Sequence, residues 1–143
     1  MRVDFYQLSA DPAEQVVAVL ARNSLMREQR VLVVAEDAGL LDRISTALWA
    51  RADSCLAHGR AGGEDDARQP ILLSTQLEAA NGAGYVMLAD GVWREGEAIT
   101  RSFLIFGEDR LTEARETWRN LGMREEVERH FWMQDGKKWI EAG

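Results

Sequence analysis

The sequence predicts an α/β fold with three layers, α/β/α, in which helices cover both faces of a mostly parallel sheet. Segments with strand character alternate with segments of helical periodicity, which is typical of this class. Residues 31–35 form an uninterrupted apolar run, as expected for a strand buried on both of its faces. The chain has 143 residues, enough to bury a substantial core, so we expect one domain spanning residues 1–143.

Five short segments are rich in apolar, β-branched or aromatic residues and are expected to form strands. One or two further short strands are expected within the last twenty residues. The polar, glycine-rich stretch 59–69 is interpreted as a loop. The five expected strands are residues 3–8, 31–35, 71–75, 85–89 and 103–106.

Helices are expected between these strands, because apolar residues recur there at spacings of three and four. The first helix is expected to begin at the segment Ser9-Ala10-Asp11-Pro12, which offers a cap followed by proline at the first helical position. Asp37 is expected to cap the second helix, and Gly122 to end the third. The expected apolar stripes lie within residues 16–25, 40–49 and 108–121.

Charge and cysteine content exclude several classes of function. Acidic residues number 24 against 17 lysines and arginines, which gives a net charge of −7. This balance argues against a protein that coats nucleic acid and against a polybasic membrane anchor, so direct DNA contact and membrane attachment are not expected. Cys55 is the only cysteine, so an internal disulfide or a cysteine zinc site is impossible, and a cytoplasmic location fits.

Motifs for cofactor binding and catalysis are missing from the sequence. No Gly-x-Gly-x-x-Gly segment follows a strand, and no Gly-Lys-Ser/Thr motif occurs. His58 and His130 lack further ligands at metal-binding spacing, so we expect neither a metal nor a cofactor. Glu36 and Asp37 follow a strand, where α/β enzymes place their sites, but helix capping is the simpler interpretation.

The third helix carries the clearest candidate site. Arg115 and Arg119 are four residues apart and flank Trp118, so the three side chains are neighbours on one helix. Two guanidinium groups can hold a carboxylate while the indole packs an apolar side chain. The alternative is that Arg115 pairs with a nearby acid and that Trp118 is only a core residue.

Several segments, in order along nearly the whole chain, resemble the chi subunit of bacterial DNA polymerase III, an accessory protein of the clamp loader. Each segment is weakly specific alone, but the ordered set is specific. The segments are residues 3–8 (VDFYQL), 30–37 (RVLVVAED), 47–49 (ALW), 54–59 (SCLAHG), 61–62 (AG), 68–75 (RQPILLST), 114–119 (ARETWR), 131–134 (FWMQ) and 136–139.

This resemblance implies a non-catalytic adaptor with a nucleotide-binding-like fold that lacks phosphate motifs. Members of the family bind the psi subunit of the clamp loader and the acidic, phenylalanine-ended C-terminal tail of single-stranded DNA-binding protein (SSB). Arg115, Trp118 and Arg119 stand at the family positions that bind the tail. Trp49 and Cys55 stand at positions expected to face psi, although Cys55 replaces a bulky aromatic residue.

Two other functions remain open from the sequence. The protein could be an adaptor for a different partner, such as a repair helicase, that uses the surface around Trp49. It could also be a small α/β nucleotide-binding enzyme that uses the carboxyl ends of its strands near Glu36.

Overall fold

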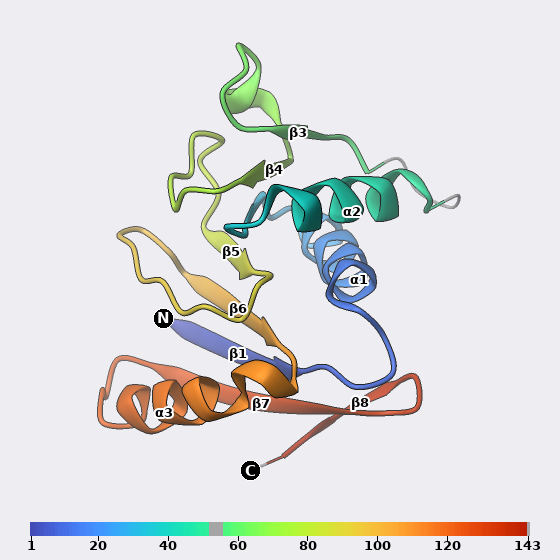
Figure 1. Cartoon of the computed structure of the whole chain (residues 1–143). Helices are drawn as coiled ribbons and strands as arrows, with labels where there is room; N and C mark the ends of the chain where they lie inside the picture. Colours follow the sequence, from blue (N-terminus) through green and yellow to red (C-terminus); the bar gives the residue numbers. More distant parts are fainter. Residues whose placement is uncertain (52–55, 143) are drawn as a thin grey trace.

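A computed structural model describes residues 1–51 and 56–142, and Cys55 therefore lies outside the described residues. The expected strands and helices are present, joined by two short 3₁₀ turns (Figure 1). In chain order the elements are β1 (Arg2–Gln7), α1 (Ala13–Met26), β2 (Val31–Val34), α2 (Ala38–Trp49), β3 (His58–Arg60), η1 (Asp66–Arg68), β4 (Ile71–Ser74), β5 (Tyr85–Leu88), β6 (Arg101–Phe106), η2 (Glu108–Arg110), α3 (Leu111–Leu121), β7 (Glu128–Asp135) and β8 (Lys138–Glu141).

The eight strands form one sheet in the order β3-β4-β2-β5-β6-β1-β7-β8. All neighbouring strands are parallel except β7 and β8, which form an antiparallel hairpin. The N-terminal strand β1 lies between β6 and β7, which come from the last third of the chain. The predicted α/β fold with a mostly parallel sheet is therefore confirmed.

Helices cover both faces of this sheet. Val31 and Val33 of β2 pack into the core beneath α1 and α2, whereas Leu32 and Val34 pack into the core on the α3 side. Successive side chains of a strand point to opposite faces, so a strand covered on both sides needs apolar residues at every position. Figure 1 shows α1 and α2 close together, with α3 running beside β7.

The prediction of a loop over residues 59–69 is wrong at its start. Residues His58–Arg60 form the edge strand β3, which pairs in parallel with β4. The Gln69 side chain packs closely over Gly59, and a Cβ there would lie 2.9 Å from its Cδ. The strand consists of a histidine, a glycine and an arginine, which show no apolar alternation, so only the pairing with β4 identifies it.

Of the two expected N-caps, one is confirmed. The carboxylate of Asp37 accepts a hydrogen bond from the backbone N–H of Gly39 at 3.0 Å, as expected for a cap of α2. The expected cap of α1 is wrong, because Pro12 itself is the N-cap residue and no side chain bonds to the first turn. The Asp11 carboxylate instead accepts a hydrogen bond of 2.7 Å from the Gln134 side chain in β7.

The short strands expected near the C-terminus are present as the β7–β8 hairpin. Its turn contains Gly136 at φ 61°, a left-handed conformation that glycine adopts without strain. His130 of β7 lies 2.5 Å from a carboxylate oxygen of Glu128 and 2.7 Å from one of Glu141 in β8. These two hydrogen bonds raise the pKa of His130 above its ordinary value. Among the described residues, no helix has the length and apolar character needed to cross a bilayer.

The caps generate a stability prediction. Asp37→Ala is expected to lower the free energy of unfolding by about 1 kcal/mol, because an N–H in the first turn of α2 loses its acceptor. Asp11→Ala, the matched control, removes an exposed hydrogen bond and should cost less. Urea unfolding of both variants measures the difference, and an equal or larger loss in Asp11→Ala would contradict this assignment of the caps.

The hydrogen bonds of His130 with Glu128 and Glu141 lead to a prediction of how stability depends on pH. A raised pKa means that the folded chain holds the His130 proton more tightly than the unfolded chain does. This contribution to stability is present below about pH 6.5, the ordinary histidine pKa, and is lost as pH rises through the folded-state value. The stability difference between the native chain and His130→Gln should therefore shrink from about pH 6 to about pH 9. A difference that stays constant across this range in urea unfolding would refute the link.

Candidate protein-binding site

Helix α3 is held on the sheet by one stripe of its side chains. Ala114 and Leu121 are fully buried, and Leu111 and Trp118 pack partly buried against the same core. The spacings of three and four residues place all four on one side of the helix. The predicted core stripe is therefore confirmed, and the opposite side of α3 faces solvent.

The Trp118 indole is both a core residue and a surface residue. Its ring packs edge-on against Phe5 of β1 at 5.2 Å and against Phe131 of β7 at 5.5 Å. The guanidinium carbon of Arg129 lies 4.0 Å from the centre of the indole ring. An Arg129 N–H also donates to the Trp118 carbonyl at 2.6 Å. The indole remains half-buried in this setting, so part of it is available to a partner.

Gly122 makes room for Arg129. A Cβ at this position would lie 2.6 Å from an Arg129 terminal nitrogen. The residue occupies the expected C-cap of α3, but its φ of −65° is right-handed, so no unusual backbone conformation requires glycine there. The close approach of the guanidinium, rather than a left-handed turn, is the physical reason for glycine.

Arg115 and Arg119 are both exposed, and within residues 1–51 and 56–142 neither has a hydrogen bond or an ion pair. The alternative in which Arg115 pairs with a nearby acid is therefore not found among the described side chains. Arg124, just after the helix, differs because Glu95 and Glu126 each hold it at 2.7 Å. The structure thus brings together two unpaired guanidinium groups beside a partly exposed indole.

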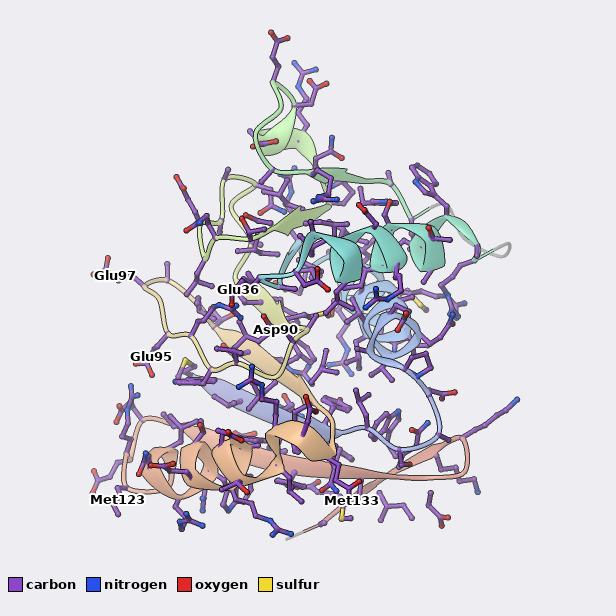
Figure 2. The ribbon with its side chains drawn as sticks, viewed as in Figure 1. Glu36, Asp90, Glu95, Glu97, Met123 and Met133 are labelled. Atoms are coloured by element: carbon purple, nitrogen blue, oxygen red, sulfur yellow. The ribbon has the colours of Figure 1, made fainter. Side chains whose placement is uncertain are left out.

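Exposed methionines lie near both ends of α3. Met123 follows the C-terminal end of the helix and is 83% exposed. Met133 of β7 is also exposed, and Figure 2 shows it near the other end of α3. Methionine is flexible and polarisable, so these side chains add adaptable apolar surface near the two unpaired arginines.

The sequence analysis did not identify Arg129 or Phe131 as parts of this site. A signal was available, because Arg129 and Phe131 are two residues apart in one strand and therefore point to the same face. That they point toward α3 follows only from the parallel pairing of β7 with β1.

The second candidate surface lies at the end of α2, on the other face of the sheet. Trp49 is 63% exposed, and its ring centre lies 4.5 Å from that of His58. His58 Nδ1 donates to the Leu56 carbonyl at 2.9 Å, and its Nε2 lies 2.7 Å from the Ser45 hydroxyl. These hydrogen bonds hold the imidazole in a fixed orientation, and the Trp49 ring packs against it. The structure therefore does not bring Trp49 together with Arg115, Trp118 and Arg119.

The Asp90 carboxylate, at the end of β5, forms a structural clamp with Arg94 and with the backbone after β2. Asp90 accepts the Glu36 backbone N–H at 3.0 Å and pairs with both terminal nitrogens of Arg94 at 2.9 Å. Figure 2 labels Glu36 and Asp90, which lie close together in that view. Burial alone would raise the pKa of Asp90, but these hydrogen bonds outweigh it and lower the pKa. An acid with a lowered pKa is a poor proton donor at neutral pH.

The described part of the chain contains no group of three histidine, cysteine or acidic side chains able to hold a metal ion. His58 and His130 are instead engaged in the hydrogen bonds described above. The two histidines therefore act as local structural contacts in this part of the chain.

Comparison with known families relates most of the chain to one of them. The family model described as DNA polymerase III chi subunit, HolC, matches residues 1–137. The matched region contains every element from β1 to β7, and β8 lies beyond it. No curated protein matches the sequence.

The contact between Arg129 and Trp118 generates a prediction. Arg129→Met is expected to lower the free energy of unfolding by about 1–2 kcal/mol, because a cation–π contact and a charge-assisted hydrogen bond are lost. Arg115→Met is the matched control and should change it by less than about 0.5 kcal/mol, since Arg115 is exposed and unpaired. Chemical unfolding measures both, and equal effects would refute this division of roles.

Proposed function

The chain belongs to the DNA polymerase III chi-subunit family, and we propose that it links that polymerase to SSB by binding the acidic C-terminal tail of SSB on α3. The family match makes the protein an accessory subunit of DNA polymerase III that acts in DNA replication, in a family of non-catalytic subunits. The binding residues in this proposal are Arg115, Trp118 and Arg119. DNA is contacted indirectly, through SSB, and the protein acts in the cytoplasm.

The observation that carries the proposal is the pair of unpaired guanidinium groups on the exposed side of α3. An exposed arginine in an acidic protein has many potential partners, yet Arg115 and Arg119 have none among the described residues. Their spacing places them one helical turn apart, where both can reach the same short peptide. Arginine can bind each carboxylate through two parallel N–H bonds, so an acidic peptide is the matching ligand.

The indole supplies the apolar half of the proposed site. The rings of Phe5 and Phe131 support Trp118 from below, so its orientation is already established before a ligand arrives. A terminal phenylalanine can pack edge-on against the exposed part of the indole, a favoured geometry for aromatic pairs. A preorganised ring also loses little conformational entropy on binding.

Electrostatics limits the expected affinity. The net charge of −7 opposes the approach of an acidic peptide, but screening confines charge effects to about 10 Å at 0.1 M salt. Local attraction by two guanidinium groups therefore dominates at contact. We expect a dissociation constant on the order of micromolar that rises with salt concentration.

For psi, the proposed contact surface is the end of α2. Trp49 is a large, exposed aromatic residue on a fixed platform, which is the kind of anchor that interfaces use. Cys55, the other residue expected there, lies outside the described residues. A repair helicase is the alternative partner for the same surface. The two proposed contacts lie on opposite faces of the sheet, so psi and the SSB tail can bind at once.

The tail-binding proposal is tested with a fluorescent peptide that has an acidic sequence and a C-terminal phenylalanine. Arg115→Ala and Arg119→Ala are each expected to weaken binding roughly tenfold, because each removes a charge-assisted contact. Trp118→Leu should weaken it further while retaining an apolar side chain against Phe5 and Phe131. Fluorescence anisotropy measures the affinities, and circular dichroism verifies that each variant is folded.

Two controls make the experiment specific. Arg27→Ala removes an exposed arginine on the α1 side of the sheet, and Trp49→Ala alters the proposed psi surface. Both should bind the peptide as the native protein does. Unchanged binding by folded Arg115→Ala and Arg119→Ala proteins would show that the site is misassigned.

A further inference from the structure

A second cationic site lies on the α1 side of the sheet. A pocket of about 260 Å³ opens between the C-terminal half of α1 and the strands β1, β6 and β7. Three arginines line it, together with polar and aromatic side chains. The lining residues used below are Arg2, Tyr6, Asn23, Arg27, Arg101 and Trp132.

Asp4, fully buried beside this pocket, orients two of the arginines. One carboxylate oxygen accepts hydrogen bonds from Nε of Arg2 at 3.0 Å and Nε of Arg101 at 2.8 Å. The other accepts from a terminal nitrogen of Arg2 at 3.1 Å and from the Trp132 indole at 3.0 Å. Burial opposes the charged form of Asp4, but these donors outweigh it and lower its pKa. Asp4 is therefore an anion that is saturated with donors.

Both arginines keep donors that Asp4 does not use. One terminal nitrogen of Arg2 and both terminal nitrogens of Arg101 have no acceptor among the described residues. Arg101 is held rigidly, because its guanidinium lies 4.4 Å from the ring centre of Phe103 and its side chain is only 13% exposed. A fixed, partly desolvated guanidinium is a strong donor to an anion.

Two further groups at the pocket have no partner among the described residues, namely Arg27 and the Tyr6 hydroxyl. Arg27 is exposed and directly follows the end of α1. Burial raises the pKa of Tyr6 to about 12, so its hydroxyl keeps its proton at neutral pH. The pocket thus offers two more hydrogen-bond donors that do not bond to Asp4, one from the end of α1 and one from β1.

The charges at the pocket do not balance. Three guanidinium groups face one carboxylate, which leaves two positive charges in a protein whose net charge is −7. Glu128 forms a long ion pair with Arg2 at 4.0 Å, but its carboxylate is exposed, is also hydrogen-bonded to His130 and does not line the pocket, so it offsets the excess only in part. Neutralising Asp4 requires only one arginine, so the remaining positive charge and the unused guanidinium donors suit an external anion.

We propose that this pocket binds the dianionic phosphate of a phosphate monoester. Guanidinium forks match the geometry of phosphate oxygens, and a phosphate monoester carries close to two negative charges at neutral pH. An adjoining pocket of about 400 Å³ shares Tyr6 and Asn23 and is also lined by Trp139. It gives room for the organic part of the ligand beside an aromatic ring. The source is a free nucleotide or the 5′-phosphate end of a nucleic acid strand.

The site is independent of the proposed SSB contact, because Arg115 and Arg119 lie on the opposite face of the sheet. Calorimetric titration with adenosine 5′-monophosphate tests it, and binding by the native protein is the expected result. Arg27→Gln should weaken this binding roughly tenfold, and it should leave the fold intact because Arg27 is exposed. Arg110→Gln, a matched exposed arginine outside the pocket, should leave the affinity unchanged.

Further titrations identify the chemistry and the source of the ligand. Adenosine without phosphate should not bind, and succinate should bind more weakly than the monophosphate. Tighter binding of a 5′-phosphorylated oligonucleotide than of its unphosphorylated form would support a strand end as the source. The proposal is overturned if the native protein binds neither phosphate ligand, if succinate or adenosine binds as tightly as the monophosphate, or if Arg27→Gln binds like the native protein.

Discussion

The packing of the Trp118 indole against Phe5 and Phe131 determines which side of α3 faces solvent. Phe5 lies on β1 and Phe131 on β7, and the two strands pair in parallel with these residues directly opposite each other. Their rings form a platform at which the indole meets both edge-on. Once Trp118 is seated there, the helical geometry places Arg115 and Arg119 beside the platform and outside the core. The proposed site is thus a consequence of core packing.

Some arginines of this acidic protein form an ion pair with a carboxylate, and others do not. Arg94 and Arg124 are held by acids, and they stabilise the connections around β5 and α3. Arg115, Arg119 and Arg27 have no such partner among the described residues. Acidic residues outnumber lysines and arginines by 24 to 17, so most arginines can find an acidic partner. An arginine without one is therefore more informative about function than a paired arginine. The unpaired groups occur where an external anion can reach them, on two different faces.

Much of the fold could be predicted because burial on two faces imposes a pattern on the sequence. The apolar run of β2 and the apolar stripes of α2 and α3 result directly from that burial. Strand β3 could not be predicted, since its polar residues form a strand only through backbone pairing with β4. The cap expected within residues 9–12 is absent for a related reason, because the Asp11 carboxylate bonds to Gln134, which is distant in sequence.

The sequence by itself determined the α/β class, the cap at Asp37 and the grouping of Arg115, Trp118 and Arg119, because all of these depend on short-range spacing. Only the tertiary structure decided that Arg129 lies over Trp118 and that Gly122 makes room for it. It also decided that Asp4 pairs with both Arg2 of β1 and Arg101 of β6. Parallel pairing joins residues about a hundred positions apart, and no local pattern encodes which strands become neighbours.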